Sequence, residues 1–293
     1  MHSRGAVLAG LLAVMSVAVD AQWAQYTPKS TPKTSDGRPN LNAPVPRGAS
    51  RKPDLSGVWQ IEASPIPELI KLLPGGENGL GEDLPNKHFI DIYADYDFGK
   101  EPLTPDAAAA NMAILKRGLA THSEDPNIRC MPDGFPLVQT IPVPFKIVQT
   151  SGLTLVLAES STTFRQIFTD GRPLPQDPQP SWMGSSVGRW EGDTFVVQTV
   201  GLNDRSALDA MGHRHSAAMT VTERYHRRDF GHMDIEMTFD DPNTFTGPLT
   251  VHFPAVLRPE TDLIEYFCAE NEKDREHLPS RQATSDTPAT GTR

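Results

Sequence analysis

The chain has 293 residues, a formal net charge of −10 at pH 7 and only two cysteines. An acidic chain without a stripe rich in Lys and Arg argues against nucleic acid and anionic membrane surfaces as partners. The sequence contains no P-loop, dinucleotide-binding glycine fingerprint, EF-hand or zinc knuckle, so an organic nucleotide cofactor is not expected.

The first residues have the layout of a secretory signal peptide. Arg4 precedes an apolar run over residues 5–19, and small residues up to Ala21 form a cleavage site. The run is too short for a membrane anchor, and no later run approaches the roughly 20 apolar residues that a transmembrane helix needs. We therefore expect residues 1–21 to be removed and the mature protein to be soluble and periplasmic or secreted.

The next segment, residues 22–53, is rich in Pro, Ser, Thr, Lys and Gly and is predicted to be a disordered linker. The tail over residues 279–293 has a similar composition and is predicted to be disordered as well. A single domain is expected between them, over residues 54–278. Its first strand carries Gly57 and Trp59.

Residues 64–103 are irregular, with aromatic residues among prolines, glycines and acidic residues. A long irregular segment of this kind is typical of a strap or lid that packs on a sheet. One helix follows, with Thr104 as N-cap and Pro105 at its first position. Its core-facing stripe is predicted to consist of Met112, Leu115 and Leu119.

Short alternating segments then fill the chain, separated by turn residues such as Asp170-Gly171. The predicted strands cover residues 139–149, 152–160, 163–169, 186–191, 194–200, 217–228, 232–240, 248–257 and 262–269. Strand 232–240 alternates most clearly, with Met233, Ile235, Met237 and Phe239 on the inner face. This number of strands is enough for an antiparallel sheet to close, so the predicted fold is mainly β, a calycin-like barrel or half-barrel with one helix and a long strap.

The two cysteines, Cys130 and Cys268, lie in the mature protein. In an oxidising compartment we expect them to form one disulfide, which would tie the segment before the sheet to the last strand. A thiol nucleophile is the alternative, but neither cysteine has a flanking motif and exported free thiols oxidise readily.

Three carboxylates fall on predicted strand faces that are otherwise apolar: Glu159, Glu223 and Glu265. A carboxylate inside a barrel must be paired, protonated or bound to a ligand, because an unpaired buried charge is costly. These groups therefore either serve a site or form interior and rim salt bridges. The candidate partners for such bridges are Arg165, Arg189 and Arg224.

His213 and His215 lie just before the predicted strand 217–228, and Glu223 lies within that strand. A His-x-His followed by Glu is similar to the cupin metal site, although seven residues separate His215 from Glu223, more than the usual cupin gap. His213 and His215 are therefore candidate ligands of a divalent metal, with His232 and His252 available to complete the set. Alternatively, they are acid–base catalysts or polar groups of a loop.

A third group of polar residues is predicted to surround one mouth of the barrel. Asp170 and Arg172 follow one strand, and Gly184–Gly188 formally match the G-x-S-x-G nucleophile motif without the helix that this motif needs after it. We therefore do not expect a serine nucleophile. The candidate ligand-binding residues are Glu159, Trp182, Trp190, Asn203 and Asp209.

Four segments carry a family resemblance: PDLSGVW (53–59) and the stretches at 164–182, 187–197 and 215–242. They resemble a widespread, largely uncharacterised family of exported β-rich bacterial proteins, and the likeness covers nearly the whole mature chain. The resemblance implies an exported β-rich domain and carries no reaction with it. Gly57-x-Trp59 is also similar to the first strand of lipocalins and other calycins, which implies that Trp59 plugs one end of a barrel.

These residues favour an exported enzyme that acts on a small organic molecule in a β-barrel cavity by acid–base chemistry, as an isomerase, lyase or hydrolase, without a cofactor or with a metal. His213 or His215 would be the base, Asp170 or Glu223 would orient it or act as the acid, and Arg172 would stabilise an anion. Two alternatives stay open. One is a non-catalytic carrier of a hydrophobic or aromatic metabolite, and the other is a tethered interaction module.

Overall fold

The computed structural model describes residues 27–72, 84–117 and 130–267. The predicted signal peptide, the predicted C-terminal tail, Leu119 and Cys268 lie outside these ranges. Within the described ranges, none of the helices has the length and apolar character needed to traverse a bilayer.

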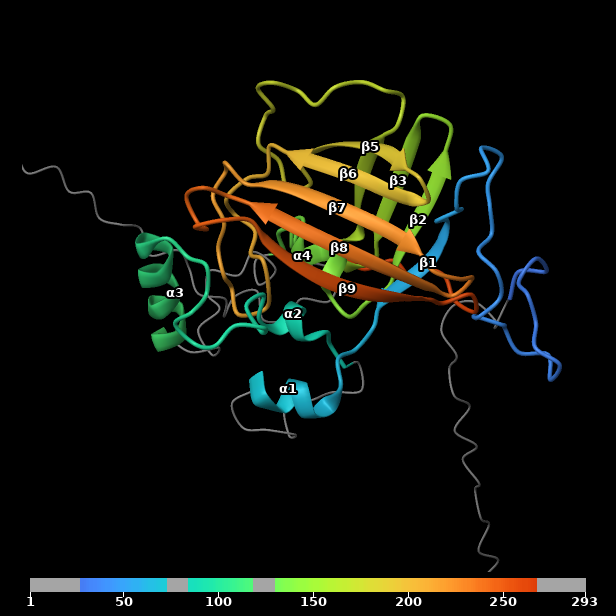
Figure 1. The fold of residues 1–293 in the computed structure, drawn as a ribbon, viewed down its shortest axis with the longest axis horizontal. Helices are drawn as coiled ribbons and strands as arrows, with labels where there is room; N and C mark the ends of the chain where they lie inside the picture. Colours follow the sequence, from blue (N-terminus) through green and yellow to red (C-terminus); the bar gives the residue numbers. More distant parts are fainter. Residues whose placement is uncertain (1–26, 73–83, 118–129, 268–293) are drawn as a thin grey trace, which may run out of the picture.

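Nine strands form a closed barrel, which confirms the predicted fold class (Figure 1). The strands are β1 (Gly57–Ile61), β2 (Phe145–Thr150), β3 (Leu153–Ala158), β4 (Thr163–Phe168), β5 (Ser185–Glu191), β6 (Thr194–Val200), β7 (Thr220–Arg227), β8 (His232–Asp240) and β9 (Leu249–Leu257). Each strand pairs with the next one along the chain, and β9 pairs with β1 to close the barrel. All neighbours are antiparallel except β4 and β5, which are parallel and meet only through Ile167–Ser186 and Phe168–Val187.

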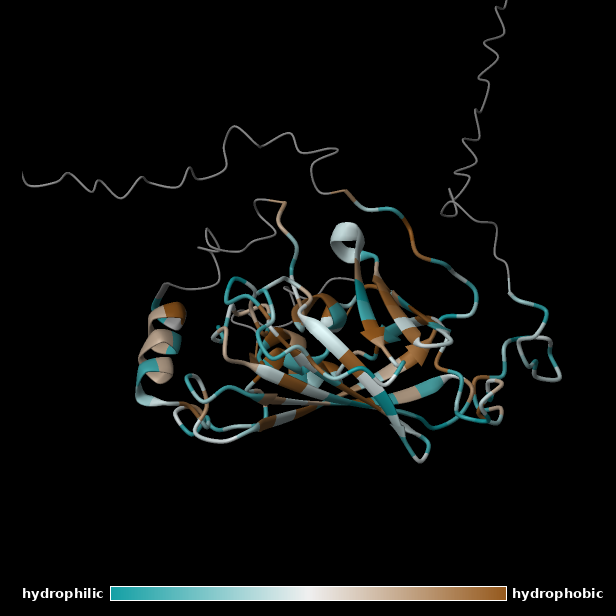
Figure 2. Cartoon of the chain, turned by 90° about the horizontal axis from the view of Figure 1, so that it is seen from above, coloured by the Kyte–Doolittle hydropathy of each residue, from teal (hydrophilic) through white to brown (hydrophobic). Residues whose placement is uncertain are grey.

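The alternation predicted for β8 is confirmed. Its buried residues are Met233, Ile235, Met237 and Phe239. In Figure 2 hydrophobic and hydrophilic residues alternate along the strands in the same way. Period-2 alternation therefore identified the inner face wherever one face is polar.

The apolar face predicted to carry Glu159 is not the inner face of β3. Thr154 and Val156 are buried, whereas the leucines at 153, 155 and 157 lie on the other, only partly covered face. Both faces of this strand carry apolar residues, so the pattern did not distinguish them, and a shift of one residue exchanges the two faces. Glu159 consequently does not point into the barrel; it has helical φ and ψ angles before the 3₁₀ turn η4 (Ser160–Thr162).

Two other strand predictions differ from the structure. Residues 137–140 form the short helix α4 (Leu137–Thr140), so the strand predicted from residue 139 begins only at Phe145. Residues 262–267 of the predicted last strand have no regular structure. The reason is the closure of the barrel: β9 already pairs with β8 and β1, so no edge is left for a further strand.

One end of the barrel is closed by Trp59, which is fully buried and donates from its indole nitrogen to the carbonyl of Leu55 at 2.9 Å. The guanidinium of Arg227, at the end of β7, lies 4.9 Å from the Trp59 ring. Arg227 is itself buried and donates to the backbone carbonyls of Asp54 and Phe230. Trp59 and Arg227 are therefore packed together at this end of the barrel.

The described part of the predicted linker is ordered against this closed end. Backbone N–H groups of Phe230 and Gly231 donate to the carbonyls of Ala43 and Leu41, both at 2.7 Å. Arg47 forms an ion pair with Asp193 at 2.6 Å in the β5–β6 turn. The prediction of disorder is therefore wrong for residues 27–53, because a segment of low hydrophobicity is held by backbone hydrogen bonds and one ion pair rather than by its own core.

The opposite end is filled by the predicted strap and by α4. The described part of the strap includes α1 (Ile66–Leu72) and α2 (Lys87–Ile90), and it buries Ile90, Ile92 and Tyr93. The predicted helix is α3 (Pro105–Arg117), which stands away from the barrel in Figures 1 and 2. Its Met112 is 40% exposed, so the predicted core-facing stripe is wrong at that position.

Candidate functional site

Glu223 lies inside the barrel, where it is fully buried and forms an ion pair with Arg165. The two η nitrogens of Arg165 contact both carboxylate oxygens. The remaining donors of Arg165 reach Ser186 Oγ at 3.1 Å, Gln139 Oε1 at 3.3 Å and Thr199 Oγ1 at 2.6 Å. All five N–H groups of the guanidinium therefore have acceptors. Glu223 is therefore the partner of an interior salt bridge, which is the second of the two roles considered for it.

Buried side chains occupy much of the barrel interior, where the sequence predicted a cavity. Large side chains such as Trp59, Phe135 and Tyr225 fill the space between the strands. A pocket beside Arg165 has an empty volume of about 230 Å³, a figure that includes its open mouth. This is below the roughly 300–1,000 Å³ of small-molecule sites. The residues that line it are Val138, Gln139, Phe145, Val156, Ala158, Thr163, Phe164, Arg165 and Met183.

Asp170 and Arg172 pair with each other on the surface rather than with the histidines. Their closest atoms are 2.6 Å apart, and their side chains are 39% and 50% exposed. The hydrogen bond from Arg172 lowers the pKa of Asp170, and the guanidinium also lies 3.8 Å from the Phe168 ring. The structure therefore does not bring these two residues to the predicted acid and anion-stabilising positions.

The predicted ligand-binding residues are dispersed. Trp182 lies under the guanidinium of Arg205 at 5.0 Å, and Asn203 accepts a hydrogen bond from the backbone N–H of Arg205 at 3.1 Å. Trp190 packs on Phe195 with ring centroids 5.2 Å apart. Glu159, on the other side of the mouth, accepts from the backbone N–H of Ile264 at 3.1 Å, and burial raises its pKa.

His215 is buried in a separate polar site. Its Nδ1 lies 3.0 Å from the carbonyl of Ser216, so this nitrogen carries the proton and the neutral ring accepts from Ser206 Oγ at Nε2, 2.9 Å away. Burial lowers the pKa of His215. Both nitrogens are occupied, so His215 does not join His213 as a metal ligand in this arrangement.

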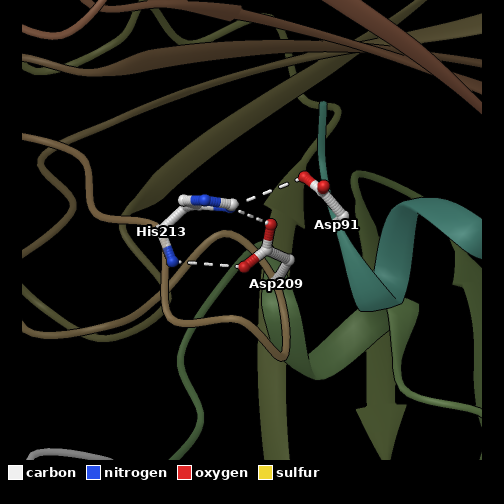
Figure 3. Close-up of side chains that lie close together, drawn as sticks. All are labelled: Asp91, Asp209 and His213. Carbon is white, nitrogen blue, oxygen red and sulfur yellow. Dashed lines mark hydrogen bonds and ion pairs between the residues drawn. The ribbon is translucent and has the colours of Figure 1, made fainter. Parts of the chain in front are cut away.

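His213 is brought onto Asp209 by a tight turn in the β6–β7 connection. The carbonyl of Asp209 accepts from Gly212 N at 3.1 Å, and the carbonyl of His213 accepts from Leu208 N at 2.8 Å. The turn folds the imidazole back so that His213 Nδ1 lies 2.6 Å from Asp209 Oδ2, while His213 N donates to Asp209 Oδ1 at 3.1 Å (Figure 3). This is the pairing of an imidazole with a carboxylate that orients it.

A third residue, Asp91, reaches the same place from the strap. It follows α2 directly, and its Oδ1 lies 3.7 Å from His213 Nδ1 (Figure 3). The strap is fixed there because Ile92 N donates to Asp209 Oδ2 at 2.7 Å and Ala210 N donates to the carbonyl of Phe89 at 2.8 Å. Asp91, Asp209 and His213 are called the carboxylate–imidazole cluster below.

The cluster is more accessible on one side than on the other. The side chain of Asp91 is 21% exposed, whereas those of His213 and Asp209 are 4% and 0% exposed. Burial, together with the charge of Asp209, raises the pKa of Asp91. Burial alone would lower the pKa of His213, but the charge and hydrogen bond of Asp209 and the charge of Asp91 raise it above its ordinary value.

Sequence reasoning identified His213 and Asp209 but missed Asp91. The only local signal was the occurrence of Asp91 among the aromatic residues of the strap, and acidic residues are common there. Because Asp91 and His213 are far apart in the sequence, their proximity depends on how the strap crosses the mouth of the barrel.

The cluster has the composition of a metal site. One possible ligand atom from each residue lies within 4.8 Å of the others. Among the described residues, these three are the group of His, Cys, Asp and Glu side chains that is close enough to hold one ion. The same arrangement without a metal is suited to proton transfer, because one carboxylate orients the imidazole and the second is partly exposed.

Comparison with known proteins gives no assignment: no protein-family model matches the chain, and no curated protein is found similar to it.

Proposed function

We propose that the protein is an exported enzyme that performs acid–base chemistry on a small organic molecule at the carboxylate–imidazole cluster, as an isomerase, lyase or hydrolase. The observation that carries this proposal is the 2.6 Å contact between His213 Nδ1 and Asp209 Oδ2, with Asp91 3.7 Å from the same nitrogen. The pKa values of His213 and Asp91 are both raised, and perturbed pKa values are frequent at functional sites.

The roles follow from exposure and hydrogen bonding. Asp209 is fully buried and already accepts from His213 and from Ile92 N, so it positions the imidazole. Asp91 has the most exposed side chain of the three, so a substrate reaches the cluster on that side. In the proposed mechanism Asp91 exchanges a proton with the substrate, and His213 holds or releases a proton as the charge on Asp91 changes.

The test is a turnover screen of the mature chain, residues 22–293, against esters, lactones, enolisable ketones and epoxides. Asp91→Asn and His213→Asn are expected to lower kcat/KM by roughly 10²–10⁴-fold on any compound that is turned over. Asp97→Asn is the matched control, because Asp97 is an exposed aspartate of the same strap. Turnover that is the same in all three variants, or no turnover of any compound, would contradict the proposal.

A second candidate function, a tethered interaction module, is favoured by exposed apolar side chains near one edge of the mouth. Phe164 is 60% exposed, and Tyr266 and Phe267 are 45% and 52% exposed. The C-terminal segment reaches this edge because Tyr266 N donates to Thr162 Oγ1 at 3.2 Å. If the protein is such a module, we expect it to associate reversibly with itself and Phe164→Ser to weaken this association. Sedimentation velocity measures it. The carrier hypothesis gains less support, because the pocket beside Arg165 is small.

Export and the Cys130–Cys268 disulfide are part of the proposal. Cys130 lies seven residues before the start of α4, whereas Cys268 lies outside the described residues. A bridge closing so long a loop would stabilise the fold by up to about 4–5 kcal/mol in the chain-entropy model. Intact-mass spectrometry of protein purified from the periplasm should show one disulfide and an N-terminus near Gln22. A full-length reduced chain would contradict both predictions.

A further inference from the structure

We infer that the carboxylate–imidazole cluster binds one divalent transition-metal ion of the zinc type, through His213, Asp209 and Asp91. This inference uses the site of the proposed function, but it is a separate claim, because acid–base chemistry at the cluster does not require a metal. The metal-ligand pair predicted from the sequence was His213 with His215. The structure replaces His215 with two carboxylates.

The donor atoms determine which cation fits. The cluster offers one imidazole nitrogen and two carboxylate oxygens, all within 4.8 Å of one another. Imidazole suits Zn²⁺, Fe²⁺, Ni²⁺ and Cu²⁺, whereas Ca²⁺ and Mg²⁺ prefer sites made of oxygen ligands alone. Three protein ligands leave one position for water or substrate, as in catalytic zinc sites.

The electrostatics of the cluster call for a cation. Two carboxylates lie beside one imidazole in a desolvated place, and the next charge that acts on Asp91 and His213 is that of Glu101, which is also negative. Lys and Arg are not among the largest influences on either group. With a neutral imidazole, which metal binding requires, the two ionised carboxylates carry a charge of −2, and one divalent ion neutralises it.

Support around the ligands is already in place. Both oxygens of Asp209 accept backbone N–H groups, one from Ile92 at 2.7 Å and one from His213 at 3.1 Å. Oδ1 of Asp91 accepts from Tyr93 N at 2.9 Å. Such outer hydrogen bonds hold ligands in orientation and are usual at protein metal sites.

A separate observation concerns the buried hydroxyl of Tyr93. Its ring packs edge-on against His213 with centroids 4.8 Å apart, and the residue is 4% exposed. Asn111 is close enough to influence the hydroxyl, but the hydroxyl has no hydrogen bond of normal geometry among the described residues. The Tyr93 ring therefore contacts the imidazole that would bind the ion.

Binding exchanges a proton for the metal. In the metal-free protein one proton lies between His213 Nδ1 and Asp209 Oδ2, which are 2.6 Å apart. The ion takes the place of that proton, which passes to solvent, and the two ligand atoms separate to about 3 Å to accommodate bonds of roughly 2.0–2.1 Å. No oxidation or reduction is involved.

The experiment is calorimetric titration of the chelator-treated mature chain with Zn²⁺, and with Mg²⁺ and Ca²⁺ as comparison ions. We expect one Zn²⁺ per chain, weakening by about tenfold or more in Asp91→Asn and in His213→Gln, with proton release visible as a dependence of the heat on buffer ionisation. His232→Gln is the matched control, because His232 pairs with Asp229 at 2.8 Å and the residues that the structure describes supply no third ligand there. Circular dichroism checks that each variant is folded. Because the Asp91 side chain is partly exposed, Asp91→Asn is expected to disturb the fold least.

Two outcomes would overturn the inference. One is no Zn²⁺ binding by the wild-type chain at millimolar concentration. The other is binding that His232→Gln removes and Asp91→Asn leaves unchanged, which would place the ion on the surface. If the chelator-treated protein turns over a substrate in a His213-dependent manner and added zinc neither binds nor changes the rate, the acid–base proposal stands and the metal inference fails.

Discussion

Arg165 on β4 and Glu223 on β7 form a buried ion pair across the interior of the barrel, with exposed fractions of 3% and 0% for their side chains. The pair joins strands that are not neighbours in the sheet, and Tyr225 Oη donates to the same carboxylate. A carboxylate that sequence reasoning proposed for catalysis is therefore part of the internal support of the barrel.

The first prediction concerns this pair. Glu223→Leu should lower the free energy of unfolding by about 3–5 kcal/mol, because it leaves the Arg165 charge buried without a partner. The double variant Arg165→Met/Glu223→Leu should recover much of that loss, since no unpaired charge then remains. Urea denaturation measures both. Glu191→Gln, which affects an exposed pair with Arg189, should leave the urea midpoint unchanged. A double variant less stable than the single one would contradict the interpretation.

The second prediction concerns Arg227 at the closed end. This buried arginine donates to backbone carbonyls, including that of Asp229 at 3.1 Å, and lies between the rings of Trp59 and Phe230. Burial lowers its pKa to about 10. Arg227→Met should cost about 3 kcal/mol, because it leaves carbonyls without donors. Arg227→Lys should not rescue stability, since one ammonium cannot match the guanidinium fork.

Thermal unfolding followed by Trp fluorescence measures the effect, because Trp59 lies in the same place. Arg224→Met, on the exposed face of the same strand, is the control and should change the midpoint little. Equal shifts for the two variants would show that burial of Arg227 has no special role.

The third prediction uses the opposite pKa shifts of two neighbouring histidines. The pKa of His213 is raised, so its contribution to stability is present below about pH 6.5 and is lost as pH rises through the higher folded value. The pKa of His215 is lowered, so its contribution is present above about pH 6.5 and is lost as pH falls toward the lower folded value.

Denaturation between pH 5 and 8.5 should therefore show opposite changes in slope for His213→Gln and His215→Gln. Removing His213 should make stability fall less on the alkaline side, and removing His215 should make it fall less on the acid side. Parallel curves for the two variants would contradict the assigned environments. The raised pKa of Asp91 also makes stability fall as pH rises, starting from about pH 4 and ending above its folded pKa, so Asp91→Asn should remove this fall in the acidic range.

The fourth prediction concerns the N-terminal segment. A Cβ atom at Gly231 would lie 2.4 Å from the Cβ of Leu41 and 2.9 Å from its Cα. The N-terminal segment can therefore pack this closely on the barrel only if residue 231 is glycine. Gly231→Ala should release residues 27–53 from the barrel and speed tryptic cleavage at the exposed Lys29 and Lys33. Gly247→Ala is the control, because nothing lies within 4 Å of a Cβ there. Unchanged cleavage in Gly231→Ala would show that this contact does not hold the segment.

The amino-acid pattern determined the features that depend on neighbours along the chain. Alternation identified β8 and its inner face, because one face of this strand is polar and the other is apolar. Asp209 and His213 are also close in the sequence, and a single turn joins them, so the local pattern was enough to make both residues candidates.

Tertiary structure decided what depends on register and on the path of connections. β3 has apolar residues on both faces, so its sequence does not show which face is buried. The register of β3 with β2 and β4 places Thr154 and Val156 inside the barrel. Arg165 meets Glu223, and Asp91 meets His213, through segments far apart in sequence. Such encounters result from closing the sheet and laying the strap across its mouth, and a one-dimensional pattern contains no distance between residues that the fold brings together.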